Sequence, residues 1–175
     1  MNPFRSLLGS VMCLVVTSCL AVTVDAAEPV PRVRTADPVI VSGIETAMRR
    51  SPFFRQLLAE IAASDVYVYV EMATLPSNLV GRMTFIGASE GVRFVRIQVD
   101  RRVSGPLMAA TLGHEFCHAA EVARERSVVD EASVLRLYQT IGFGSAIYAS
   151  QYESDAAVSA GVRVRRETMA RLDGH

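Results

Sequence analysis

Apolar side chains recur at helical spacing in the segment that follows the first forty residues. Between Val41 and Ala63 they fall mostly three and four positions apart, which is typical of helices with one buried face. Ser51 and Pro52 interrupt this period, because serine is a common helix N-cap and proline suits the first helical position. The pattern therefore predicts two helices that meet at Ser51.

The middle of the chain is rich in β-branched and aromatic residues. It predicts strands over 65–71, 81–87 and 92–99, the last two joined as a hairpin through 88–91, and so a short, mainly antiparallel sheet. In the third strand Arg93 alternates in step with Val95, Ile97 and Val99, so neither face is purely polar. That strand is either a sheet edge that pairs with an extended substrate or an ordinary strand packed on helices.

Three further helices are expected over 107–122, 130–141 and 151–172, with a turn over 142–145 between the last two. The fold class is therefore α+β, with N-terminal helices, the short sheet, a central helix and two C-terminal helices. A chain of 175 residues is typical of one domain, which we place at 39–175.

The first 27 residues are expected to be a signal peptide. Arg5 supplies the positive charge, residues 7–24 are mostly apolar, and small residues at 24–27 suit cleavage. The protein is then exported, either periplasmic or secreted. The alternative is a lipoprotein attached to a membrane through Cys19, because residues 16–19 loosely fit a lipobox. Residues 28–38 contain three prolines and are expected to form a linker.

Charge and cysteine content exclude some partners. Eighteen basic and eighteen acidic side chains balance, and the basic ones, all arginine, are scattered. Nothing therefore favours nucleic acid or an anionic membrane surface as a partner. Cys117 is the one cysteine beyond the signal segment, and we interpret it as a small core residue rather than a metal ligand.

The central helix carries the pattern H-E-x-x-H, as His114, Glu115 and His118. Residues four apart lie on one helical face, so the two histidines would bind the same ion. Glu115 lies about 100° around the helix from His114, where a general base reaches a water without binding the metal. Neutral imidazoles suit Zn²⁺, the expected cofactor. The alternative is a buried helix whose histidines satisfy each other or the backbone.

The uncharged residues around the motif, and Thr111 before it, resemble the extended signature of the zincin metallopeptidases. Glu121 and Arg124 stand where the metzincin pattern has glycine and histidine, so that group is excluded, and the spare His175 lies at the C-terminus. A carboxylate ligand is the better choice, which makes the chain similar to a gluzincin over roughly 105–165. This resemblance implies a zincin-like domain and a third zinc ligand supplied by a glutamate on a downstream helix.

Glu153 fits that third ligand best, because it follows His118 by about 35 residues, enough for a loop, a helix and a return helix. Small residues after it would let its helix approach the metal helix, although Ala157 stands where many gluzincins have an aspartate. Glu121 is a rival, which we interpret instead as a hydrogen-bond acceptor for a histidine N–H. Glu131 is a further rival.

The expected function is that of a zinc-dependent metallopeptidase that hydrolyses peptide or protein substrates. Glu115 would take a proton from the attacking water and pass it to the leaving amine. Tyr138, Tyr148 and Tyr152 are the candidate donors to the oxyanion. The alternatives are a non-catalytic metal-binding or scaffold module and a metal hydrolase that acts on other bonds.

Overall fold

The structure of the protein, a computed structural model, describes residues 32–143 and 153–170. The expected signal peptide and Cys19 lie outside these described residues. In chain order the elements are β1 (Val33–Arg34), α1 (Pro38–Arg50), α2 (Pro52–Ala62), β2 (Val66–Ala73), β3 (Gly81–Ser89), β4 (Val92–Asp100), α3 (Gly105–Arg124), α4 (Glu131–Ile141) and α5 (Asp155–Ala170). The expected α+β class is confirmed.

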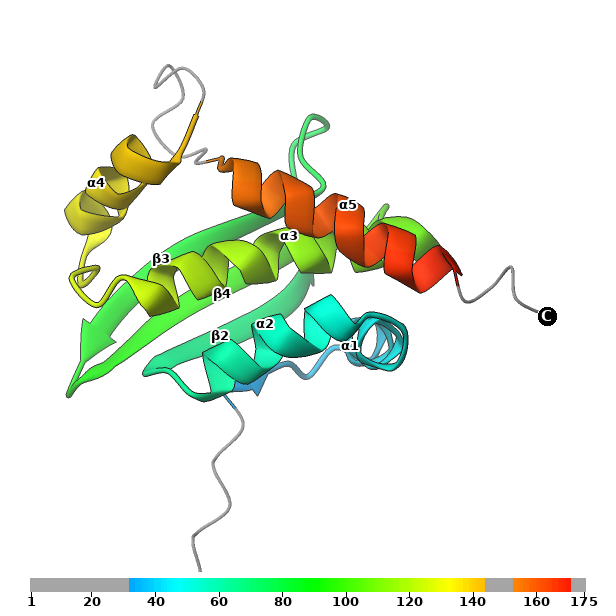
Figure 1. The fold of residues 1–175 in the computed structure, drawn as a ribbon, viewed down its shortest axis with the longest axis horizontal. Helices are drawn as coiled ribbons and strands as arrows, with labels where there is room; N and C mark the ends of the chain where they lie inside the picture. Colours follow the sequence, from blue (N-terminus) through cyan, green and yellow to red (C-terminus); the bar gives the residue numbers. More distant parts are fainter. Residues whose placement is uncertain (1–31, 144–152, 171–175) are drawn as a thin grey trace, which may run out of the picture.

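The helices gather on one face of a four-stranded sheet, and α3 lies in their middle (Figure 1). α5 runs alongside α3, while α1 and α2 pack on α3 from its other side. α4 follows the C-terminal end of α3 and lies near β3. Among the described residues, no helix is both long enough and apolar enough to cross a bilayer.

The sheet has the strand order β1-β2-β4-β3 and is mixed. The pairs β1/β2 and β2/β4 are parallel and only β3/β4 is antiparallel, so the expectation of a mainly antiparallel sheet is wrong. The hairpin folds β4 back between β2 and β3. β4 is therefore a central strand, and of the two alternatives for it the structure has the ordinary strand packed on helices. Its buried stripe of Val95, Ile97 and Val99 suits the centre, whereas β3 is only partly buried and forms the edge.

The two N-terminal helices form as expected. Ser51 lies between them, and its hydroxyl accepts from the backbone N–H of Phe54 at 3.0 Å, which caps α2. Asp37 caps α1 through Val39 N–H at 2.9 Å. The expected linker, residues 28–38, is not wholly irregular, because Val33–Arg34 within it pair with β2 as β1.

α3 forms the centre of the core. Most of its length is buried, and Phe116 meets Phe54 of α2 edge to face, with ring centroids 5.4 Å apart. Burying a side chain of this size stabilises the fold by about 1.5–3 kcal/mol. The helix that carries the H-E-x-x-H motif is thus held on several sides by apolar packing.

α5 approaches α3 very closely at Gly113. A Cβ atom at this position would stand 2.7 Å from Cγ2 of Val164, so only glycine fits without displacement. Ala157 and Ala160 on the facing side of α5 are buried, as the sequence suggested, whereas Ala156 is exposed.

Arg93 is buried on the helix-facing side of β4 and closes the C-terminal end of α3. Its guanidinium donates to the carbonyl oxygens of Val122 at 2.6 Å and Glu125 at 2.7 Å. It also pairs with both carboxylate oxygens of Asp65, at 2.8 and 2.6 Å. The last carbonyls of a helix lack partners within the helix and carry partial negative charge, so this cation fixes the end of α3 to the sheet.

Replacing Arg93 by methionine is expected to destabilise the protein by about 3 kcal/mol, because it leaves buried carbonyls and a carboxylate without their donor. Asp65→Asn should cost less, since Asp65 is partly exposed. The hydrogen bond from Arg93 lowers the pKa of Asp65, so its contribution is present above about pH 4 and is lost as the pH falls further. Urea unfolding of the three proteins at neutral and acid pH measures both effects. A difference between wild type and Asp65→Asn that grows in acid would contradict this account.

Gly113→Ala is expected to lower the free energy of unfolding by about 1–3 kcal/mol through overpacking against Val164. Val164→Ala removes the contacting methyl groups, so Gly113→Ala should cost less in that background. Thermal unfolding of the four proteins forms a double-mutant cycle, and Ser159→Ala on the exposed side of α5 is the control. If the two substitutions changed the free energy of unfolding additively, the contact between positions 113 and 164 would not be the cause of the destabilisation.

Candidate metal centre

His114 and His118 project from the same face of α3 toward one point. Their Nε2 atoms lie 3.2 Å apart, and their ring centroids are separated by 4.8 Å. His118 is buried, while the side chain of His114 is 24% exposed. The helix therefore positions both imidazoles as the i, i+4 spacing predicts.

Glu153 completes a group that could hold a metal ion. Its Oε1 lies 3.4 Å from Nε2 of His114 and 3.6 Å from Nε2 of His118. An ion about 2.0–2.1 Å from three ligands at tetrahedral angles keeps those ligands roughly 3.3 Å apart. Two imidazole nitrogens and one carboxylate oxygen therefore fit such an ion in kind and in spacing. The partial exposure of His114 and Glu153 leaves one side of the group open to solvent.

Glu153 reaches this position from just before α5, not from within it as the sequence suggested. The hydroxyl of Ser154 accepts from the backbone N–H of Ala157 at 3.1 Å, so the helix begins after Ser154. The residues that directly follow α4 hold the backbone of Glu153, because its carbonyl accepts from Phe143 N–H at 3.1 Å and Ser154 forms a β-bridge with Gly142. The third group of the cluster is thus fixed by a helix cap on one side and a β-bridge on the other.

Glu121 supports this arrangement from behind the histidines. Its buried carboxylate accepts from Nδ1–H of His118 at 2.8 Å, from the hydroxyl of Tyr138 at 3.0 Å and from the hydroxyl of Ser154 at 2.5 Å. A proton held on Nδ1 leaves Nε2 of His118 as the atom with a free lone pair. The geometry agrees with the interpretation that Glu121 binds a histidine rather than the ion.

The pKa values in the cluster follow from burial and these contacts. Burial lowers the pKa of His114, and the neighbouring His118 lowers it further, which favours the neutral imidazole that binds metals. Burial alone would lower the pKa of His118 as well, but the negative carboxylates of Glu121 and Glu153 beside its ring nitrogens outweigh burial and raise the pKa to about 9. A metal ion at Nε2 of His118 would therefore displace a proton from that nitrogen. Hydrogen bonds, chiefly those with His118, outweigh burial in the two carboxylates and lower both of their pKa values.

Glu115 lies on the flank of α3 that faces β3. The residue is buried, and its carboxylate lies against Gly81, where a Cβ atom would stand 2.5 Å from Oε1. Burial raises the pKa of Glu115 to about 7, opposed by the charge of His118 and the backbone N–H of Met83. An acid with a pKa near neutrality exchanges a proton readily in either direction.

Several other candidates are not brought to the cluster. Glu131 is the first residue of α4, and its side chain is exposed away from the histidines. Tyr138 contacts Nδ1 of His118, on the side of the ring opposite Nε2, so it is not placed as an oxyanion donor. Cys117 is buried, and it is not part of the group found among the described residues. Tyr148, Tyr152 and His175 lie outside the described residues.

The sequence analysis missed two residues near the site, Gly81 and Ser154. Gly81 begins a strand and admits the carboxylate of Glu115, and Ser154 is one of several polar residues in its segment. The serine two residues before a run of small residues is a helix start signal, and it marks the boundary of α5 better than the apolar period does. The close contact between Gly81 and Glu115 depends on the tertiary fold, so no local sequence pattern predicts it.

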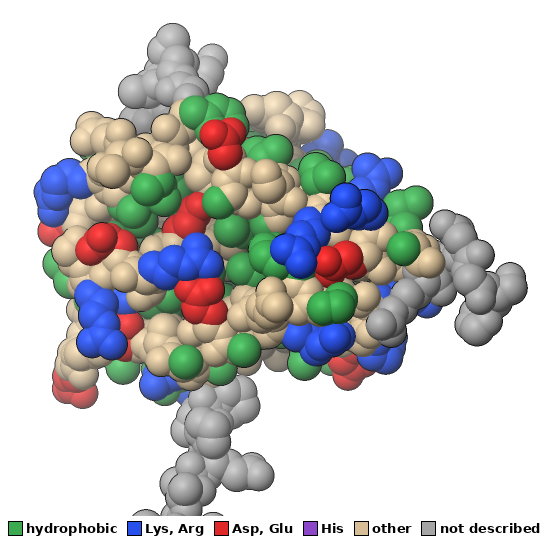
Figure 2. Space-filling model, viewed as in Figure 1, with side chains coloured by type: hydrophobic (Ala, Val, Ile, Leu, Met, Phe, Trp, Pro, Cys, Tyr) green, Lys and Arg blue, Asp and Glu red, His purple; other side chains and the backbone are tan. Residues whose placement is uncertain are grey.

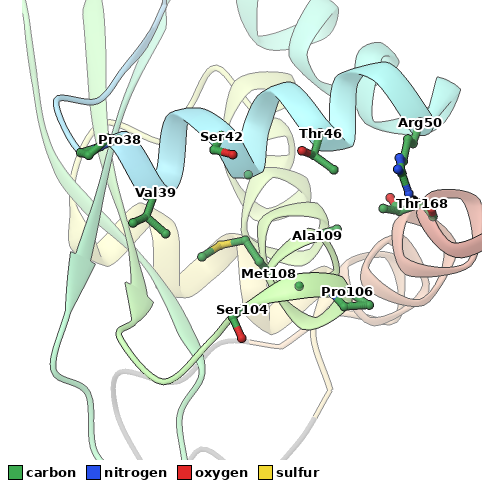
Figure 3. A pocket seen from close by; sticks show the side chains of 12 residues that line it. Pro38, Val39, Ser42, Thr46, Arg50, Ser104, Pro106, Met108, Ala109 and Thr168 are labelled. Atoms are coloured by element: carbon green, nitrogen blue, oxygen red, sulfur yellow. Dashed lines mark hydrogen bonds between the residues drawn. The ribbon is translucent and has the colours of Figure 1, made fainter. Parts of the chain in front are cut away.

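On the face seen in Figure 2, arginines and acidic side chains lie interspersed with apolar patches. A separate groove lies between α1 and the start of α3, lined by residues such as Val39, Met108 and Thr168 (Figure 3). It includes none of the residues of the histidine and glutamate cluster.

No family model, curated protein or solved structure matches this chain. Function is therefore inferred from the residues of the cluster and their geometry.

Removing either a histidine or the glutamate of the cluster is expected to abolish metal binding. His118→Ala and Glu153→Ala each delete one atom of the three, and two remaining ligands hold a divalent ion weakly. Elemental analysis by mass spectrometry after equilibration with zinc and dialysis should give one ion per chain for the unmodified protein and much less for both variants. Glu131→Ala, which removes a carboxylate outside the cluster, should keep the ion. Full metal content in Glu153→Ala would exclude Glu153 as a ligand.

Proposed function

We propose that this protein is a zinc-dependent metallopeptidase similar to the gluzincins. The observation that carries the proposal is the convergence of His114 Nε2, His118 Nε2 and Glu153 Oε1, with the buried carboxylate of Glu115 on the next position of the same helix. Two imidazoles and one carboxylate are a ligand set that catalytic zinc sites use, and three protein ligands leave one position open. The proposal includes export from the cytoplasm, as the first 27 residues predict.

In peptide hydrolysis a bound zinc ion and the side chains of the protein would have separate roles. Bound zinc would make water acidic at the open position and polarise the carbonyl of the scissile bond. Glu115 would accept a proton from the attacking water and donate it to the leaving amine, because its carboxylate lies on the same helix as the two histidines, directly after His114. Glu121 keeps the proton of His118 on Nδ1 throughout, because it accepts that N–H in a buried network.

The edge strand β3 supplies a surface for the substrate. Among the described residues it pairs with β4 alone, and Gly81 and Met83 bring its backbone against Glu115. An extended peptide that adds to this edge by main-chain hydrogen bonds would carry a peptide bond past the carboxylate. We therefore assign the substrate-binding edge to β3, and not to the strand at 92–99 for which the sequence left this role open.

Glu115→Gln is expected to reduce peptide hydrolysis by about 100- to 10,000-fold, because glutamine keeps the shape of the side chain but cannot accept the proton. Since Glu115 is not one of the three ligand groups, the variant should still bind one zinc ion. Hydrolysis of a quenched fluorescent peptide library by the zinc-loaded protein measures the rate, and elemental analysis measures the metal.

The matched control is Glu45→Gln, which changes an exposed carboxylate on α1 and should leave the rate unchanged. Undiminished hydrolysis by Glu115→Gln would refute the assigned role of Glu115. Zinc binding without hydrolysis of any peptide by the unmodified protein would instead favour a binding module or a hydrolase for another bond.

A further inference from the structure

A cleft between the edge strand β3 and the start of α4 contains an arginine that lacks an anionic partner. Seven residues line this cleft: Arg82, Met83, Thr84, Phe85, Arg96, Glu131 and Val134. The Nε atom of Arg96 is buried and has no hydrogen-bond partner, and no described residue forms an ion pair with its guanidinium. By contrast, Arg93 on the same strand pairs with Asp65. A half-buried guanidinium beside a cleft is suited to a carboxylate that comes from outside the chain.

The wall around Arg96 has further polar groups. Thr84 lies directly opposite Arg96 in the antiparallel register, so both side chains belong to one face of the sheet. Arg82 lies two positions along on the same strand as Thr84. Its Nη2 donates to Gln98 at 2.5 Å, while its Nε is buried without a partner. The cleft therefore offers two positive charges and a hydroxyl beside the free edge of β3.

The cleft meets the candidate catalytic residues at the edge of β3, although the side chains of Arg96 and Thr84 lie on the face of the sheet opposite the helices. Met83 lines it, and the backbone N–H of Met83 acts on the carboxylate of Glu115. Val134 also lines it and lies one helical turn before Tyr138, which contacts His118. A peptide paired with the edge of β3 would therefore place a side chain in the cleft within a few residues of the metal centre.

We propose that Arg96 selects peptides with an aspartate or glutamate side chain close to the bond that is cleaved. This inference rests on the proposed peptidase function for the cleavage step, but the binding step is independent of it. Glu131 on the opposite wall is exposed and forms no ion pair with Arg96 or Arg82 among the described residues. Its charge weakens the attraction for an acidic side chain, so Glu131→Gln should strengthen the preference.

The test uses the zinc-loaded Glu115→Gln protein, so that binding is measured without cleavage. Two fluorescein-labelled decapeptides differ only in a central glutamate or glutamine, and fluorescence anisotropy gives their dissociation constants. The glutamate peptide should bind about tenfold more tightly, because it forms charge-assisted hydrogen bonds. Adding Arg96→Gln should remove that preference and leave the affinity of the glutamine peptide unchanged. Arg101→Gln, an exposed arginine after β4, is the matched control and should keep the preference.

Equal affinity for the two peptides, no binding of either, or a preference that survives Arg96→Gln would each overturn the proposal. Acid-selective binding that depends on Arg96 would support it even if the unmodified protein cleaved neither peptide. In that case the peptidase proposal fails and the cleft stands as a binding site for acidic peptides. If the unmodified protein cleaved both peptides and the two bound equally well, the peptidase proposal would stand and the proposed selection by Arg96 would fail.

Discussion

The buried carboxylate of Glu121 is the interaction on which the candidate site depends. A charged group away from water is costly unless donors surround it, and here three side chains donate to it. Each donor has a second effect. His118 is left with Nε2 free for an ion, Tyr138 ties α4 to α3, and Ser154 starts α5 with Glu153 directly before it. The carboxylate of Glu121 thus orients one candidate ligand, His118, and positions another, Glu153.

The rest of the fold brings backbones close enough for this network to form. Gly113 lets α5 lie against α3, and Gly81 lets the edge strand lie against Glu115. Arg93 fixes the C-terminal end of α3, because it donates to carbonyl oxygens there and pairs with Asp65. The helix of the candidate metal centre is therefore held at its end, along one side by α5 and along another by the sheet. A helix fixed in this way holds its histidines in one orientation, as a metal centre requires.

Local rules predicted much of this from the sequence. The i, i+4 spacing fixes His114 and His118 on one face in any helix, and the Ser51-Pro52 pair fixes the break between α1 and α2 because capping is local. The position of Glu153 near the histidines followed from the length of the intervening chain and from the family likeness. Its place outside α5 did not, because the boundary is set by the Ser154 cap.

Long-range pairing was beyond such rules. The strand order that puts β4 between β2 and β3 depends on which apolar faces meet, and residues adjacent in sequence do not determine that. Arg93 gave a mixed pattern along its strand, and its partners at the end of α3 lie about 30 residues away. The contact between Gly81 and Glu115 has the same origin. Sequence predicted the chemical groups, whereas tertiary packing decided their surroundings.

The most direct test of the central claim is a crystal structure of the zinc-loaded protein, with the ion located by anomalous scattering at the zinc edge. The account predicts one strong peak about 2.0–2.1 Å from Nε2 of His114, Nε2 of His118 and one oxygen of Glu153, with Glu121 bonded to Nδ1 of His118. A peak elsewhere, or a sulfur ligand from Cys117 at about 2.3 Å in place of Glu153, would contradict it.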